Sequence, residues 1–184
     1  MKLIILAAGK GSAPTSETGG KPACLRRFDE HSTVLDTIIS VGEAAGARQT
    51  IVVGGYRILE IMEAYPSLKY YYSPEWKETG ALASLLRAAP EFNDELLVAY
   101  SDVVYERRTA ELLLGARGEL VAAYDSTWQT RYEGRTEGIL AEAEKLFRFE
   151  TGALAVSRAR LDGPGGAAGP DGSVSGAGDE SGPD

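Results

Sequence analysis

The sequence predicts an α/β protein with a mainly parallel sheet and helices on both faces. Three observations lead to this class. The aliphatic run Leu3–Leu6 is continuous and is followed by glycine, which is typical of a strand buried on both faces. Segments of strand and helix character then alternate along the chain, which implies crossover connections between parallel strands. The 184 residues, 43% of them hydrophobic, suffice for one ordinary domain with a core.

Each element has its own local signal. The first predicted helix carries apolar residues at helical spacing, with Ser32 or Thr33 as N-cap and Gly46 as the stop; these residues are Val34, Leu35, Ile38, Ile39 and Ala45. The further predicted strands are Thr50–Val53, which ends at Gly54-Gly55, then Lys69–Tyr72, Glu95–Tyr100 and Glu119–Tyr124. The further helices are Arg57–Ala64, one marked by Leu82, Leu85, Leu86 and Ala89 and closed by Pro90, and Arg108–Leu114.

The composition changes at the C-terminal end. From Gly163 the chain has eight glycines and three prolines, and Val174 is its only larger aliphatic residue. Such a segment buries too little apolar surface to offset the entropy of ordering. We therefore predict an ordered domain over residues 1–161 and a disordered Gly/Pro/Asp-rich tail over residues 162–184.

Charge and composition narrow the classes of protein. Five of the 27 acids and none of the 19 bases follow Arg160, so most of the net charge of −8 lies in the tail. The remaining 22 acids nearly balance the bases, which predicts no nucleic-acid partner. The single Cys24 fits a reducing compartment. The longest apolar stretch, Leu3–Ala8, is too short to cross a membrane, and we expect a cytoplasmic protein without a membrane partner.

A glycine-rich stretch, Ala7–Leu25, follows the first strand. It is no Walker loop, because Lys10 is followed by Gly11 and Ile4 stands where the first glycine would be. It is no dinucleotide fingerprint, because Pro14 replaces the third glycine. Two readings remain: a loop whose backbone N–H groups surround a triphosphate, or a plain strand-to-helix turn.

Two motifs in this stretch resemble a family signature. LAAGKGS and TGGKPACL are similar to L-A-A-G-x-G-S/T-R and T-x-x-x-P-K-x-L of the nucleotidyltransferases that activate phosphorylated sugars and choline, which share a MobA-like NTP transferase fold. Three further segments resemble the phosphocholine cytidylyltransferase type in the same order, namely ETGALASLLRA, ELLVAYSDVVY and WQTRYEGRTEGILAEAEKL. The resemblance covers roughly residues 2–160 and implies a Rossmann-like nucleotidyltransferase fold.

The resemblance implies an enzyme. Its reaction would transfer a cytidylyl group from CTP, or another NTP, to a phosphorylated small alcohol or phosphonate such as phosphocholine or 2-aminoethylphosphonate, and release pyrophosphate. Mg²⁺ is the implied cofactor. Asp102, directly after an apolar strand, is the implied metal ligand and catalytic residue, because magnesium prefers hard carboxylates. The implied nucleotide-binding residues are Leu6, Ala7, Ala8, Gly9, Gly11, Ser12, Gly55, Thr79, Gly80 and Ser84.

These residues also have plainer readings. An Asp after a strand, such as Asp102, is often a turn residue. Gly80 before a helix can be a cap, and Ser84 can be an ordinary helix residue.

The resemblance also implies an acceptor site, in the segment WQTRYEGRTEGILAEAEKL, which resembles the family's acceptor side. Its implied residues are Asp125, Trp128, Tyr132 and Lys145, with Tyr105 after the metal site. Aromatic faces there would suit a choline-like cation.

The chain departs from the signature at two cations. Ala13 stands where the signature has arginine, and Ala23 stands where it has lysine. Lys10 and Lys21 flank these positions and are the candidate catalytic cations.

The chain also departs from the family in length. TGALAVSRARL begins a later family segment and then passes into the tail, as in a truncated or frame-shifted chain. Two alternatives to the cytidylyltransferase remain: a sugar-1-phosphate nucleotidyltransferase, and a degenerate nucleotide-binding or interaction module of the same fold.

Overall fold

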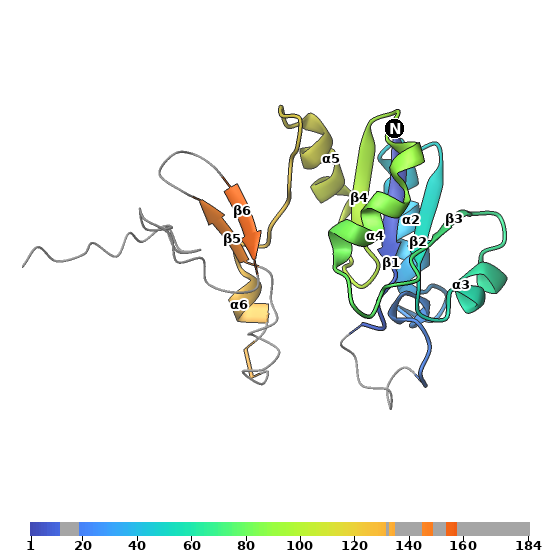
Figure 1. Ribbon diagram of the computed structural model, residues 1–184. Coiled ribbons are helices and arrows are strands. Elements are labelled where there is room, and N and C mark those ends of the chain that lie inside the picture. The colour runs from blue at the N-terminus through green and yellow to red at the C-terminus, as the bar shows by residue number, and fades with distance from the viewer. Residues whose placement is uncertain (12–18, 132, 135–144, 149–153, 158–184) are drawn as a thin grey trace, which may run out of the picture. The chain divides into compact units, whose positions relative to one another are not determined.

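The computed structural model describes residues 1–11, 19–131, 133–134, 145–148 and 154–157. The chain divides into two compact units, Met1–Val121 and Ala122–Asp184 (Figure 1). The predicted boundary between residues 161 and 162, the tail after it and the segment TGALAVSRARL beyond Ser157 lie outside the described residues, so those expectations stay predictions.

The first unit is built on a four-stranded parallel sheet. Its strands are β1 (Lys2–Ala7), β2 (Thr50–Gly54), β3 (Lys69–Tyr72) and β4 (Leu96–Tyr100), in the order β3-β2-β1-β4. β1 pairs in register with both β2 and β4, so that Leu3 faces Thr50 on one side and Leu97 on the other. The continuous aliphatic run thus forms a central strand, and the predicted α/β class is confirmed.

Helices cover both faces of this sheet because successive strand side chains point to opposite sides. On one face, Leu3, Ile5 and Val52 pack with residues of α2 (Val34–Ala44), α3 (Ile58–Ala64) and α5 (Arg107–Gly115). On the other face, Ile4 and Ile51 pack with Leu85 of α4 (Ala81–Arg87) and with Ala88 just after it. Figure 1 shows α2 and α4 on opposite sides of the strands.

The predicted start of α2 is confirmed at Thr33. The Thr33 hydroxyl accepts a hydrogen bond from the Asp36 backbone N–H, and the Asp36 carboxylate accepts from the Thr33 backbone N–H. This capping box satisfies two amide donors at the helix start. Ser32 instead donates its hydroxyl to Asp29, so the alternative N-cap is excluded.

One predicted strand is wrong. Glu119–Tyr124 forms no strand, and its apolar side chains face solvent, with Leu120 93% exposed and Tyr124 64% exposed. Its apolar run, Leu120–Tyr124, is a local signal, whereas a strand also needs a partner for its backbone groups. Among the described residues this segment pairs with none, and the boundary between the two units falls within it.

The second unit contains three short elements in its described residues. α6 (Trp128–Arg131) is a single turn, and β5 (Lys145–Arg148) pairs antiparallel with β6 (Leu154–Ser157).

The first unit also contains two short 3-10 helices. One, η1 (Ala23–Leu25), lies at the end of the glycine-rich stretch, and the other, η2 (Ala89–Glu91), follows α4. The residues that end the predicted helix at Ala89 and Pro90 therefore form η2 rather than the last turn of α4.

Candidate active site

The carboxyl ends of the four strands bring the candidate residues of the first unit together. The Tyr56 backbone N–H donates to the Ala8 carbonyl at 2.8 Å, which joins the segment after β2 to the segment after β1. Ser73 N–H donates to the Gly54 carbonyl at 2.8 Å, and Ser101 N–H donates to Leu6 at 3.2 Å. This edge is where open parallel sheets place their ligands.

The glycine stretch turns sharply at Gly11 and again at Gly19 and Gly20, on either side of residues 12–18. Gly11 has a φ of +79°, and Gly19 and Gly20 have φ values of +60° and +76°. A side chain is disfavoured in this left-handed region. A Cβ on Gly11 would also lie 2.9 Å from the Ala23 Cβ, so the first turn lies directly against η1. Ser12 and Ala13 fall within residues 12–18, outside the described residues.

Gly55 is closely packed at this edge, against the segment after β1 and against Trp76. A Cβ there would lie 2.7 Å from the Ala8 carbonyl oxygen and 2.7 Å from Cγ of Trp76. The Tyr56 ring meets Trp76 edge-on, with 5.4 Å between ring centroids. Trp76 was not predicted at this edge. Its position between the end of β3 and the segment ETGALASLLRA is the signal that could have pointed to it.

The predicted nucleotide-binding residues Thr79, Gly80 and Ser84 have different environments. The Thr79 hydroxyl donates to the Glu75 carbonyl at 2.8 Å, so it holds its own turn. Gly80 is the exposed N-cap of α4. Ser84 is buried on α4, and its Oγ lies 3.4 Å from Oγ of Ser73, which is also buried. Ser73 is thus a further buried hydroxyl at this edge that was not predicted.

Asp102 lies near η1. It is exposed, directly after β4. Burial raises the pKa of the Cys24 thiol to about 12, and the negative charge of Asp102 adds to this effect. Lys10 and Lys21 are exposed, and neither they nor Asp102 form a salt bridge within the described part of the chain. Ala23 is buried against Gly11, so the motif position after Pro22 presents no charge.

The candidate metal ligand is a single carboxylate. Residues 1–11, 19–131 and the other described positions contain no group of three His, Cys, Asp or Glu side chains able to hold a metal. Mg²⁺ in nucleotide sites is commonly held by one or two carboxylates together with substrate phosphates and waters. One exposed Asp at the carboxyl end of the sheet therefore fits magnesium that arrives with a nucleotide.

The predicted acceptor residues belong to the second unit. Oδ1 of Asp125 accepts from the Thr127 backbone N–H at 2.9 Å and from its hydroxyl at 2.8 Å, and Oδ2 lies 3.0 Å from Arg131 Nε. These hydrogen bonds lower the pKa of Asp125. Trp128 begins α6 and Lys145 begins β5. Tyr132 lies outside the described residues, and the joining of this set with Asp102 in one site stays a prediction.

Tyr105 belongs to the first unit and packs against its core. Its buried hydroxyl has no hydrogen-bond partner among the described residues, and burial raises its pKa. This environment is that of a core tyrosine and gives no support to contact with an acceptor.

A four-stranded parallel sheet with helices on both faces and a glycine-rich turn after its first strand is a Rossmann-like α/β arrangement, the class that places ligands at the carboxyl ends of its strands. The chain belongs to the family of MobA-like NTP transferase domains, whose model matches residues 3–159.

Two known proteins resemble the chain at about a quarter identity. It is 26% identical over 155 residues to a CTP:phosphoglutamine cytidylyltransferase from Campylobacter jejuni, covering 79% of this chain and 61% of that protein. The chain thus spans less than two thirds of the length of this relative. A nucleotidyl transferase from Methanothermobacter thermautotrophicus superposes with a TM-score of 0.50 at 25% identity, over 61% of this chain and 55% of the other.

A CTP:phosphocholine cytidylyltransferase from Streptococcus pneumoniae overlaps less, with a TM-score of 0.46 at 22% identity, over 55% of this chain and 44% of that one.

Among the described residues, no helix has both the length and the apolar character needed to cross a bilayer.

Proposed function

We propose that this protein transfers the cytidylyl group of CTP to a small phosphorylated acceptor and releases pyrophosphate. The observation that carries the proposal is the meeting of the glycine turn, Gly55 and Asp102 at one edge of the sheet. The likeness to the CTP:phosphoglutamine cytidylyltransferase supports CTP as the donor. The acceptor class comprises phosphorylated small alcohols, amides and phosphonates, with phosphocholine and 2-aminoethylphosphonate as examples.

In this reaction an oxygen of the acceptor phosphate attacks the α-phosphorus of CTP. The bond from the α-phosphorus to the bridging oxygen breaks, and pyrophosphate leaves with that electron pair. No covalent enzyme intermediate is needed, so the protein has to align the two substrates and neutralise charge. In this proposal the backbone N–H groups of Gly9 and Gly11 donate hydrogen bonds to the phosphates of CTP. The exposed ammonium of Lys21 neutralises the negative charge that develops on the phosphates in the transition state.

Gly55 and Trp76 form the base side of the site in this proposal. Because Gly55 lies against both Ala8 and Trp76, the Trp76 ring lies next to the start of the glycine stretch. An aromatic ring at this place could stack on the flat base of a nucleotide. Asp102 would hold Mg²⁺, which when bound neutralises the phosphates and polarises the α-phosphate. Ser84 and Ser73 offer buried hydroxyls near this side of the sheet.

A second candidate is a nucleotide-binding module with little turnover. Ala23 favours it, because this residue is buried against Gly11 and carries no charge. Losing a preorganised charge contact to a transition state typically costs about a hundred- to a thousandfold in rate. Such a protein would bind CTP and release no pyrophosphate.

The test is a pyrophosphate-release screen. CTP, UTP and ATP are each paired with phosphocholine, 2-aminoethylphosphonate, phosphoglutamine and a sugar 1-phosphate, with Asp102→Asn as the matched control. Release with CTP and a small phosphorylated acceptor supports the proposal. Release only with UTP and a sugar 1-phosphate contradicts it, and CTP binding without release in any pair supports the second candidate.

A further inference from the structure

The carbonyl of Gly20 receives two side-chain donors from one distant turn. The Tyr56 hydroxyl donates to it at 2.8 Å, and Nη1 of Arg57 donates to it at 2.7 Å. Gly20 is buried and has a φ of +76°. Both donors lie more than 30 residues further along the chain, between β2 and α3, so this contact is a tertiary one rather than part of a local turn.

The turn that supplies these donors is itself held in place. The Tyr56 backbone N–H binds the Ala8 carbonyl, and Gly55 is enclosed between Ala8 and Trp76. The same three residues, Gly55, Tyr56 and Arg57, therefore contact the glycine stretch at its start and again near its end. We call Tyr56 and Arg57 with the Gly20 carbonyl the loop clamp.

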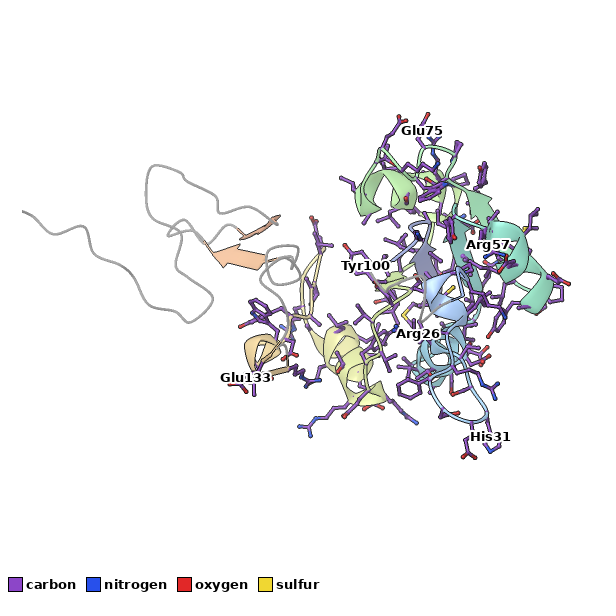
Figure 2. All side chains as sticks on the ribbon, turned by 90° about the horizontal axis from the view of Figure 1, so that it is seen from below. Arg26, His31, Arg57, Glu75, Tyr100 and Glu133 are labelled. Carbon is purple, nitrogen blue, oxygen red and sulfur yellow. The ribbon has the colours of Figure 1, made fainter. Side chains whose placement is uncertain are left out.

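Arg57 has an unusual backbone. Its φ and ψ are 47° and 38°, and it is the one non-glycine residue with positive φ in the described part of the chain. The Cβ of an L-residue is crowded in this region, and residues held there against preference cluster at functional sites. Besides Gly20, its guanidinium pairs with Glu60, so the strained backbone directs the side chain to two partners. Figure 2 shows Arg57 at the start of α3.

The clamp restricts the residue that follows Gly20. The peptide between Gly20 and Lys21 is planar, so fixing the Gly20 oxygen also fixes the direction of the Lys21 N–H. On the other side, Pro22 is fully buried, and a residue before proline is confined to extended backbone. Lys21 is exposed between these two restraints. Its ammonium therefore projects from a backbone with little freedom.

We propose that Tyr56 and Arg57 are positioning residues that hold Gly20 so that Lys21 is presented to the phosphates of a bound nucleotide. The proposal rests on the proposed function for the nature of the ligand. In this chain the motif lysine position is the buried Ala23, so Lys21 is the cation that residues 19–25 can present. The clamp then acts on phosphate affinity and not on recognition of the base.

The experiment compares Tyr56→Phe and Arg57→Gln with a parent chain, and every protein carries Trp128→Phe so that Trp76 is its single tryptophan. Trp76 touches Gly55 and Tyr56, so its fluorescence reports titrations with CTP and with CMP. Tyr70→Phe is a matched control, because it removes a hydroxyl that binds the Tyr65 carbonyl at 2.7 Å in another part of the unit. Glu60→Gln is a second control, because it removes the other partner of Arg57 and leaves the clamp.

Each clamp variant should weaken CTP binding by about three- to tenfold, the effect of one net hydrogen bond, while CMP binding changes less than about twofold. Amide exchange across residues 19–25 should be faster in both variants without nucleotide, and neither control should show these changes. Arg57→Lys keeps a donor and should recover part of the CTP affinity.

The proposal is overturned if exchange across residues 19–25 is unchanged, or if CTP and CMP weaken by the same factor. If the native chain binds neither nucleotide, the proposed function fails, and the exchange comparison still decides whether the clamp orders this segment.

Discussion

The methyl group of Ala23 lies against the backbone of Gly11, with 2.9 Å between the Ala23 Cβ and the position that a Cβ on Gly11 would take. One residue starts η1 and the other turns the chain after β1. Their contact therefore joins the beginning and the end of the glycine stretch Ala7–Leu25. It also places position 23, where the signature that the chain resembles has lysine, directly beside the turn.

Gly11→Ala should damage this turn. The new Cβ meets Ala23, and the φ of +79° disfavours any L-residue, at a cost of roughly 1–2 kcal/mol of unfolding free energy. We expect a lower free energy of unfolding in urea and weaker CTP binding. Gly46→Ala is the control, because Gly46 has a φ of +100° with no atom within 4 Å of its added Cβ. That variant should lose stability and keep CTP affinity; equal losses of affinity in both would contradict the assignment.

Ala13→Arg combined with Ala23→Lys should restore the two motif cations. Because charge that develops in the transition state gains most from a fixed cation, turnover should rise more than CTP affinity. The gain expected for one such contact is about a hundred- to a thousandfold in rate. Single-turnover kinetics with CTP and phosphocholine measure it. A native chain that is already fast, with no gain in the variant, would contradict the role given to the two alanines.

Asp102→Asn should abolish the magnesium-dependent part of stabilisation by CTP. A ligand that binds the native state raises the melting temperature by mass action, and the amide is a poorer ligand for Mg²⁺ than the carboxylate. Thermal unfolding with CTP, with and without Mg²⁺, gives the difference. Glu63→Gln on α3 is the control. An unchanged magnesium effect in Asp102→Asn would place the metal ligand elsewhere.

Glu91 should make the stability of the first unit depend on acid pH. Its carboxylate, 5% exposed, contacts Lys2 at 2.8 Å, Lys69, and the Tyr71 hydroxyl at 2.5 Å. The hydrogen bond from Lys2 is the largest cause that lowers the pKa of Glu91 from 4.5 to about 2. A lowered pKa means that the unfolded chain takes up the proton first. The stabilisation is therefore complete above pH 4.5 and is lost as the pH falls toward 2.

The measurement is urea unfolding of the native chain and Glu91→Gln between pH 2 and pH 7. The native chain should be more stable at pH 7, and the difference should shrink through the window from pH 4.5 to about pH 2. Glu78→Gln, an exposed change, should show no such window. A difference independent of pH would mean that packing, and not the charge of Glu91, stabilises this cluster.

Local chemistry determined most of the regular elements. The aliphatic run of β1, the β-branched residues of β2 and the cap at Thr33 each carry a signal within a few residues, because burial on both faces and capping impose residue types at fixed spacing. The turns at Gly11, Gly19 and Gly20 were also predictable, since tight backbone turns favour glycine. The role of Asp102 was implied by the family resemblance and stays a prediction.

Tertiary structure alone decided the contacts between distant segments. The donors from Tyr56 and Arg57 to Gly20, the place of Trp76 against Gly55 and the cations around Glu91 join residues far apart in sequence. Glu119–Tyr124 has an apolar run but forms no strand, because pairing depends on a neighbour that the local sequence does not specify. Propensity acts along the chain, whereas hydrogen-bond partners and close approach are set by which segments the sheet brings side by side.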